Sequence, residues 1–212
     1  GREGYRSRRR LVGCIEKLLM ARAAATITTT ESRARFFARA YGIARPLVLQ
    51  NQPRLMHSGG GDRLRQGLGL AGSWPIVLYQ GGLQPGRGLE GLIAAMCDVP
   101  DAYLVFVGGG SLANWLREQV VELGLSDRVH FVHTVPLEEL PAYTASADIG
   151  VQPIENTCLN HFTTDSNKLF EYLNAGLPVI ASALPEITRI VRQYDVGVLV
   201  TAGDVAELAE AI

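Results

Sequence analysis

The feature that most constrains the fold is a regular alternation of short apolar runs with helical segments from residue 75 onward. The runs are almost continuously apolar and rich in β-branched residues, and they cover residues 76–80, 102–108, 129–133, 149–153, 178–182 and 196–200. Strands that are buried on both faces have this pattern. The segments with helical character cover residues 89–97, 112–123, 137–146, 167–175, 185–194 and 205–212. The alternation predicts an α/β fold with a Rossmann-like, doubly wound parallel sheet of about six strands.

The stretch before residue 75 lacks this regular alternation of strands and helices. Residues 6–23 predict a basic amphipathic helix, residues 31–41 a second helix, and residues 26–30 and 46–50 two strands. Two strands and two helices are too few for a complete doubly wound domain. We therefore expect residues 1–56 to be the trailing part of an N-terminal domain. The chain also begins with Gly and its last helix stops at residue 212, so we expect a piece of a longer protein.

A flexible linker is expected between the two parts. Ser58 is followed by three consecutive glycines, a composition that is typical of linkers. The predicted organisation is an N-terminal fragment at residues 1–56, a linker at residues 57–74, and a ligand-binding domain at residues 75–212.

Charge divides the chain in the same place. The first 65 residues hold 14 Lys and Arg against 4 Asp and Glu, whereas the remainder holds 6 against 17. The predicted N-terminal helix carries four clustered arginines: Arg6, Arg8, Arg9 and Arg10. Such a helix favours peripheral contact with an anionic membrane surface, and a solvated basic face is an equally good interpretation.

Composition excludes several classes. With 47% hydrophobic and 19% charged residues, the chain is neither disordered nor membrane-spanning, because no apolar run approaches the roughly 18 residues that a bilayer requires. Three widely spaced cysteines give neither a disulfide framework nor a metal spacing. We expect a cytoplasmic protein, with the inner face of the membrane as the alternative location.

Ligands of open parallel sheets bind beyond the carboxyl ends of the strands, so the loops there should carry function. The first loop contains Gly81 and Gly82 and ends in Gly86-Arg87-Gly88. It is close to a P-loop, but Arg87 replaces the lysine and Gly88 replaces the Ser or Thr that would hold magnesium. Phosphate binding without a P-loop metal is predicted, with a plain tight turn as the alternative.

The second loop, residues 108–113, matches the relaxed dinucleotide fingerprint G-x-G-x-x-G/A. The acidic residue expected at the end of the following strand is missing, because that strand ends at His133. A glycine-rich turn beside a nucleotide is therefore favoured over a nicotinamide cofactor.

The third candidate is the helix predicted at residues 167–175. Its first turn, with Ser166, Asn167 and Lys168, predicts an anion site. Glu171 follows one turn later on the same side, where a carboxylate could accept two hydrogen bonds from a ribose diol. A solvated salt bridge between Glu171 and Lys168 is the alternative.

Three motifs together resemble a known family: "GGLQPGRGLEGLI", "LVFVGGGS" with the segment through "ADIGVQPI", and "NKLFEYLNAGLPVIAS". They are similar, in order and spacing, to the C-terminal nucleotide-sugar-binding domain of GT-B-fold glycosyltransferases of the retaining family 4, also called group 1. The resemblance implies transfer of a sugar from a nucleoside-diphosphate sugar to an acceptor hydroxyl, in polysaccharide or glycolipid biosynthesis. The implied partners are the nucleotide-sugar donor and a lipid-linked or polysaccharide acceptor, and no nucleic acid.

The resemblance also implies residue roles. Arg87 and Glu171 become the catalytic candidates, with Arg87 on the donor pyrophosphate and Glu171 on its ribose. The donor-binding candidates are Gly81, Gly82, Gly109, His133, Thr134, Asn160, Ser166, Asn167, Lys168 and Glu171. Of these, His133 and Thr134 belong to the segment that passes the base, and Asn160 to the segment that approaches the sugar.

Two departures from the family pattern concern the transferred sugar and one phosphate contact. Gly82 stands where the family often has Arg, and Thr163 stands where the first glutamate of a Glu-x7-Glu motif would fall. No Asp-x-Asp motif occurs, so neither a metal nor another cofactor is predicted. Three alternatives stay open: a GT-B-fold sugar-nucleotide epimerase, a non-catalytic nucleotide-sugar-binding module and, less favoured, an NAD-dependent oxidoreductase. The fragment itself is expected to bind nucleotides but to transfer sugar poorly.

Overall fold

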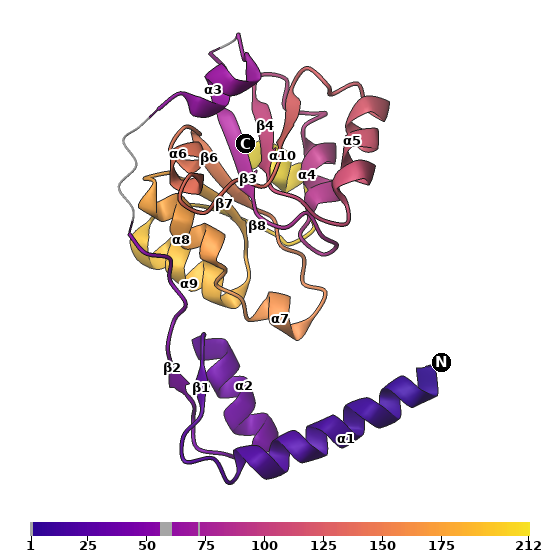
Figure 1. Ribbon diagram of the computed structural model, residues 1–212, viewed down its shortest axis with the longest axis vertical. Coiled ribbons are helices and arrows are strands. Elements are labelled where there is room, and N and C mark those ends of the chain that lie inside the picture. The colour runs from indigo at the N-terminus through magenta and orange to yellow at the C-terminus, as the bar shows by residue number, and fades with distance from the viewer. Residues whose placement is uncertain (1, 56–60, 72) are drawn as a thin grey trace. The chain divides into compact units, whose positions relative to one another are not determined.

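The computed structural model describes residues 2–55, 61–71 and 73–212 (Figure 1). Contacts divide the chain into two units, Gly1–Asn51 and Gln52–Ile212. Residues 57–60 and 72 of the linker predicted at residues 57–74 lie outside the described residues. The boundary between the units therefore falls a few residues before the predicted end of the N-terminal fragment.

The first unit contains helix α1 (Arg2–Met20), strand β1 (Ile27–Thr28), helix α2 (Glu31–Tyr41) and strand β2 (Leu47–Val48). The two short strands pair in parallel, and α2 begins where the Thr30 side chain accepts a hydrogen bond from the Arg33 amide. All four predicted elements are present. Both strands are shorter than predicted, and α1 begins four residues earlier than predicted.

The second unit is built on a sheet of six parallel strands in the order β5-β4-β3-β6-β7-β8. Its strands are β3 (Ile76–Gln80), β4 (Tyr103–Val107), β5 (Val129–Val132), β6 (Ile149–Gln152), β7 (Val179–Ser182) and β8 (Gly197–Val200). The predicted doubly wound parallel sheet is thus confirmed. Each strand falls within its predicted apolar run, because a strand covered on both faces must be apolar throughout.

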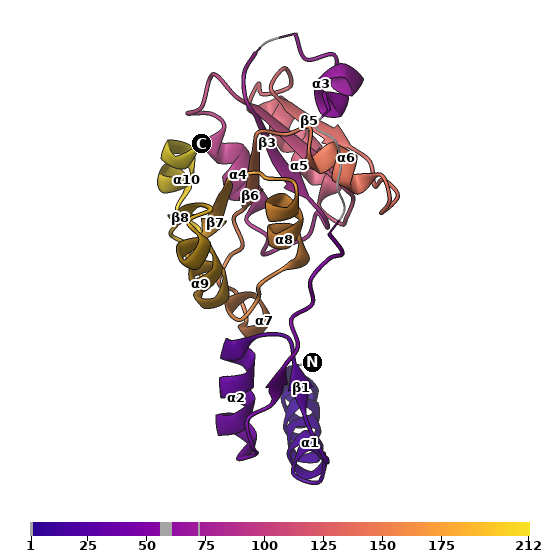
Figure 2. The ribbon, with the colours of Figure 1, turned by 90° about the vertical axis from the view of Figure 1, so that its left-hand side faces the viewer.

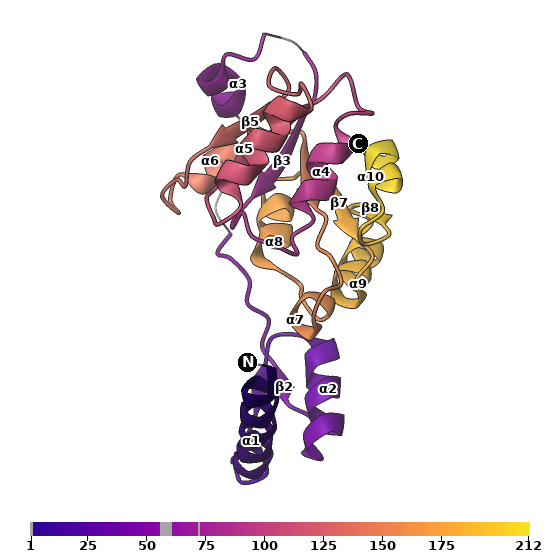
Figure 3. The ribbon, with the colours of Figure 1, turned by 90° about the vertical axis from the view of Figure 1, so that its right-hand side faces the viewer.

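Helices cover both faces of this sheet (Figures 2 and 3). One layer contains α4 (Leu89–Ala95), α5 (Ala113–Glu122) and α10 (Val205–Ala211), and the other contains α3 (Arg63–Leu68), α6 (Leu140–Thr144), α8 (Asn167–Asn174) and α9 (Pro185–Tyr194). Each layer has its own apolar core. Val77 and Tyr79 face the first core, whereas Ile76 and Leu78 face the second, as strand alternation requires.

Two helices were not predicted. Helix α3 lies inside the predicted 57–74 linker, where Leu64 is buried and its amide donates a hydrogen bond to the Ser146 side chain. That part of the segment belongs to the folded domain, because one buried leucine anchors a helix too short to show a periodic pattern. Helix α7 (Leu159–Phe162) lies inside the predicted polar loop.

The sheet has its topological switch point between β3 and β6. From β3 the chain continues to β4 on one side, and from β6 it continues to β7 on the other. Leu78 pairs with Gly150, so the strand ends Gln80 and Gln152 lie level with each other. Ligands of doubly wound sheets bind in the crevice outside the carboxyl ends of the strands at this point.

Candidate functional site

One flank of the switch point consists of the two glycine loops, which follow β3 and β4. The amide of Leu83 donates to the Gly109 carbonyl, and the amide of Leu112 donates to the Leu83 carbonyl. A Cβ on Gly108 would lie 2.2 Å from the Gly81 carbonyl oxygen, and a Cβ on Gly110 2.2 Å from that of Leu83. The dinucleotide-like spacing of glycines is therefore explained by close packing of one loop on the other.

The other flank is the first turn of α8, which presents Lys168 to the glycine loop. Lys168 is 8% exposed, and its Nζ lies 3.8 Å from the centre of the Tyr79 ring. The same atom lies 3.4 Å from the position that a Cβ on Gly81 would occupy. The Lys168 side chain makes no hydrogen bond or ion pair with any residue in the described ranges. A buried ammonium without an acceptor is costly, so this position suits an anionic ligand.

Electrostatics at Lys168 point the same way. Burial, together with the nearby Arg87 guanidinium, lowers the Lys168 pKa to about 7, and the Glu171 carboxylate opposes that shift. Arg87 is half-buried and also lies close enough to act on the Tyr79 hydroxyl, whose pKa is raised by burial. Arg87 of the first glycine loop and Lys168 of α8 thus repel each other, and an added negative charge between them would relieve this repulsion.

Glu171 is held by neighbours from two other elements. Its Oε2 accepts a 2.5 Å hydrogen bond from the Gln80 side-chain Nε2, and the Gln80 side-chain Oε1 accepts a 2.8 Å hydrogen bond from the Thr144 hydroxyl. The neighbouring Tyr172 hydroxyl accepts from the Gln80 backbone amide and donates to the Val151 carbonyl. The first turns of α8 are therefore fixed to both strands of the switch point.

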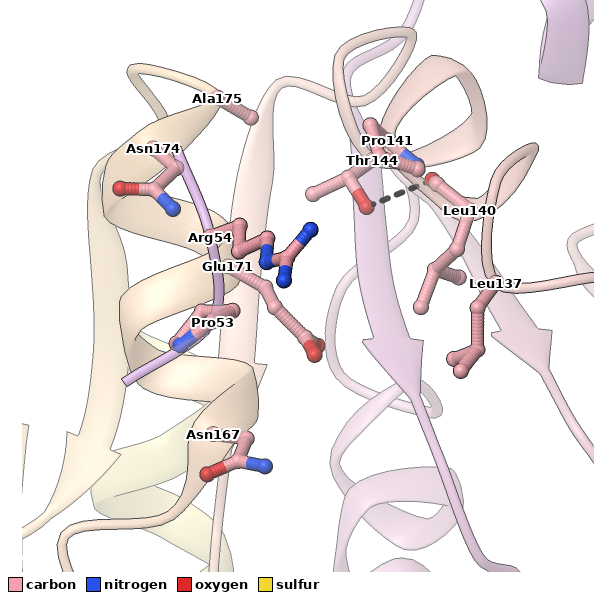
Figure 4. Close-up of a pocket in the computed structure, with 10 residues that line it drawn as sticks. All are labelled: Pro53, Arg54, Leu137, Leu140, Pro141, Thr144, Asn167, Glu171, Asn174 and Ala175. Atoms are coloured by element: carbon pink, nitrogen blue, oxygen red, sulfur yellow. Dashed lines mark hydrogen bonds between the residues drawn. The ribbon is translucent and has the colours of Figure 1, made fainter. Parts of the chain in front are cut away.

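Glu171 also lines a cavity of about 260 Å³, together with Asn167 of the same helix. The opposite wall is formed by Leu137, Leu140, Pro141 and Thr144, and Figure 4 shows the Glu171 carboxylate directed into the space between the walls. Pro53, Arg54, Asn174 and Ala175 complete the lining. An apolar wall facing one carboxylate can accept a flat ring on one side and hydroxyl groups on the other.

The other predicted site residues lie at varying distances from this centre. Thr134 lies beside Gly109, whose added Cβ would be 3.2 Å from the Thr134 hydroxyl. His133 and Thr134 line a different cavity, of about 470 Å³, with Phe131 and Tyr143. Asn160 is exposed on α7, and Gly82 is exposed in the first glycine loop. The structure thus places Gly81, Arg87, Lys168 and Glu171 near one another, and α7, which carries Asn160, contacts the first glycine loop where His161 lies against Gly86.

Ser166 occupies the N-cap of α8 in an unusual conformation. Its φ of 42° is positive, a region that non-glycine residues seldom occupy, and its side chain makes no capping hydrogen bond. Thr163, at the position of the missing glutamate, is buried and donates its hydroxyl proton to the Leu159 carbonyl. Backbone strain of the kind seen at Ser166 concentrates at ligand-binding turns.

Sequence reasoning missed Gln80, Tyr79 and Thr144. Gln80 carried a usable signal, because it is a polar residue at the carboxyl end of an otherwise apolar strand. Tyr79 and Thr144 carried none, since both fit their apolar surroundings and only the fold brings them beside Lys168 and Gln80.

The fold and the site together define a family. A family model described as glycosyl transferases group 1 matches residues 62–212, and the chain belongs to that family. Among solved structures, sucrose-phosphate synthase from Thermosynechococcus elongatus is 28% identical with a TM-score of 0.80, over 94% of this chain and 50% of that one. HepE of Anabaena in complex with UDP shares the fold, with 24% identity and a TM-score of 0.80 over 93% of this chain and 56% of that one.

Curated relatives agree with the family. A GDP-mannose-dependent alpha-(1-6)-phosphatidylinositol monomannoside mannosyltransferase of Mycolicibacterium smegmatis is 30% identical over 155 residues, 71% of this chain and 40% of that protein. A D-inositol 3-phosphate glycosyltransferase of Nocardia farcinica is 28% identical over 212 residues, 93% of this chain and 46% of that protein. The chain spans less than half the length of either relative.

Proposed function

We propose that residues 75–212 bind the nucleotide of a nucleoside-diphosphate sugar, and that the protein transfers the sugar to an acceptor hydroxyl. The observation that carries this proposal is the pairing of Lys168 and Glu171 one turn apart on α8. Lys168 is a buried cation beside the first glycine loop, and Glu171 is a carboxylate that lines a partly apolar cavity. A diphosphate joined to a nucleoside matches both requirements.

The proposed chemistry follows from where charge develops. Departure of the sugar leaves negative charge on the diphosphate, and fixed positive groups that face this charge lower the barrier. Lys168, Arg87 and the amides at the start of α8 would supply such groups, while Glu171 would accept hydrogen bonds from the ribose hydroxyls. Gly81 and Gly82 would allow the pyrophosphate to approach the backbone.

Calorimetry against a panel of UDP, GDP, ADP and NAD tests this proposal. At least one nucleoside diphosphate should bind, and NAD should not compete with it. Arg87→Ala and Glu171→Ala should each weaken binding about tenfold, whereas Arg192→Ala and Glu210→Ala, at exposed positions near the ends of α9 and α10, should not. Unchanged affinity in both site variants would remove the site assignment.

The relatives support finer proposals about substrate and outcome. One of them is named for GDP-mannose and a phosphatidylinositol mannoside, and another for inositol 3-phosphate. We propose that the donor carries a hexose and that the acceptor is lipid-linked or a polyol. We also propose that the hexose is transferred with retention of its anomeric configuration, as expected for family 4. In the full-length protein, proton NMR of the product should show the anomeric configuration of the donor, and inversion would refute this proposal.

Metal independence is a separate proposal. The described residues contain no group of three or more His, Cys, Asp or Glu side chains arranged to hold a metal ion. We expect Lys168 and Arg87 to neutralise the diphosphate instead. Nucleotide affinity should therefore be the same in EDTA and in millimolar magnesium, and a strong dependence on magnesium would contradict this expectation.

Peripheral membrane contact through α1 is also proposed. Leu11, Ile15, Leu18 and Leu19 are exposed along this helix, as is Arg8. The side chains of Arg6, Arg9 and Arg10 lie outside the described part of the structure. Within the described residues, no helix has the length and apolarity needed to cross a bilayer. Vesicles containing phosphatidylserine should retain the protein in flotation, whereas phosphatidylcholine vesicles should not.

A further inference from the structure

Two glutamines end the two central strands, and only one of them is tied to the site. Gln80 and Gln152 are 1% and 0% exposed, and they lie level with each other at the carboxyl ends of β3 and β6. Gly150, two residues before Gln152, faces the Tyr172 ring of α8, so Gln152 points to the α8 side as Gln80 does. Neither side-chain polar atom of Gln152 has a hydrogen-bond partner among the described residues. The two glutamines therefore differ in contacts and not in burial.

The orientation of the Gln80 amide is fixed by its neighbours. Its Nε2 lies 2.5 Å from Glu171 Oε2, and its Oε1 lies 2.8 Å from the Thr144 hydroxyl. The reversed amide would place its oxygen against a carboxylate oxygen, two acceptors without a proton between them. The Thr144 hydroxyl also lies 2.9 Å from the Leu140 carbonyl, so its one proton faces two acceptors, Gln80 Oε1 and the Leu140 oxygen. Gln80 therefore donates to Glu171 and accepts from Thr144.

The hydrogen bonds from Thr144 to Gln80 and from Gln80 to Glu171 engage one oxygen of the Glu171 carboxylate and leave the second oxygen available to a ligand. Glu171 Oε2 is engaged by Gln80, whereas Oε1 has no hydrogen-bond partner in the described ranges. Glu171 and Thr144 lie on opposite walls of the 260 Å³ cavity, and Gln80 joins them from the end of β3. The cavity thus contains a carboxylate whose direction is set before any ligand arrives.

We propose that Gln80 is a positioning residue, which holds Glu171 so that one carboxylate oxygen faces the ribose diol of the donor. The inference rests on the proposed function, because it assigns Gln80 to the ribose-binding step of that same site. A glutamate side chain on a helix surface samples several rotamers, and ordering it on binding costs affinity. The charge-assisted hydrogen bond from Gln80 removes that cost in advance.

The test separates ribose recognition from phosphate binding. UDP, GDP, their 2′,3′-dideoxy forms and inorganic pyrophosphate are titrated into the 212-residue chain by calorimetry. Gln80→Leu should weaken UDP or GDP binding about tenfold, while the dideoxy nucleotides and pyrophosphate should change less than twofold. Thr144→Val, which removes the hydroxyl that contacts the Gln80 amide oxygen and leaves Gln80 bonded to Glu171, should produce a smaller loss in the same direction.

Gln152→Leu is the matched control. It removes an equally buried amide from the adjacent strand end, so it should leave the preference for ribose over dideoxyribose unchanged. An equal loss for all ligands in Gln80→Leu, or a lost preference in Gln152→Leu, would show a general structural role and overturn the inference. Unchanged ribose preference in both Gln80→Leu and Thr144→Val would overturn it as well.

Glu171→Ala distinguishes the two proposals. If this variant loses the ribose preference while Gln80→Leu retains it, the proposed function stands and the role of Gln80 is refuted. If the wild-type chain binds no nucleoside diphosphate, or if Glu171→Ala keeps the full ribose preference, the proposed site itself fails and the inference falls with it. Thermal unfolding of each variant shows that the comparison is made between folded proteins.

Discussion

The two flanks of the switch point are built in opposite ways. The glycine flank, residues 81–88 and 108–112, brings two loops together through backbone hydrogen bonds and tolerates no Cβ at Gly108 or Gly110. The helix flank, the first two turns of α8, places Lys168 and Glu171 where their side chains matter. Substitutions at the closely packed glycines, Gly108 and Gly110, should therefore lower folding stability, and those on the helix flank should lower ligand affinity.

The largest expected effect is on the glycine flank. Gly108 has a φ of 140°, and an added Cβ would meet the Gly81 carbonyl. Gly108→Ala should destabilise the protein by about 3 kcal/mol, because backbone strain and a backbone clash add. Gly203→Ala is the control, since Gly203 also has a positive φ but open space around it, and it should cost about 1 kcal/mol. Urea unfolding measures both, and equal losses would show that strain alone sets the requirement.

Next in size is the loss of the buried cation on the helix flank. Lys168→Met keeps the apolar stem but removes the charge, so pyrophosphate and nucleoside diphosphates should bind about 30-fold more weakly. The same substitution should raise the melting temperature of the unliganded protein at pH 7, because it removes a buried charge without an acceptor. A variant that lost stability and kept its affinity would reverse the roles assigned to the two flanks.

A pH dependence follows from the same lysine. Its pKa is lowered to about 7 in the folded protein, chiefly by burial, while diphosphate binding favours the protonated form. Affinity for UDP should therefore fall as the pH rises from 7 to 9, by up to about tenfold per pH unit. The unliganded protein should gain stability over the same range, because the unfolded chain binds the extra proton. Lys168→Met should lose most of both trends in calorimetry and in thermal melts.

The smallest expected effect comes from Gly82→Arg, which adds a charged side chain to the glycine flank. Gly82 is exposed, and an added Cβ would make only ordinary contacts with Gln84. Gly82→Arg should fold normally and strengthen pyrophosphate binding about threefold, by one solvent-exposed phosphate contact. Gly82→Gln has a similar volume and no charge, so equal strengthening by both would exclude an electrostatic cause.

Sequence alone predicted the second unit well, because strands covered on both faces and helices between them leave strong periodic signals. The ends of β3 and α9 were predicted to the residue. The charged candidates Arg87, Lys168 and Glu171 could be selected from the sequence, since they follow a strand end or lie in the first turns of a helix, and their roles remain predictions. Helix α3 and the contacts of Gln80 could not be predicted, because a short helix has no period and the Thr144 partner lies 64 positions away.

Tyr172 has a mechanical consequence. Its hydroxyl bridges the Gln80 amide and the Val151 carbonyl, and its ring lies against Gly150, so one side chain clamps α8 to both strands where they diverge. The helix that carries Lys168 and Glu171 is therefore stiff relative to the sheet. If the protein binds nucleotide sugars as proposed, donors of different size should be accommodated by other segments near the site, such as the four-residue helix α7 and the exposed turn at Leu137. Under that proposal, substitutions that change the preferred donor sugar are expected in those segments and not in α8.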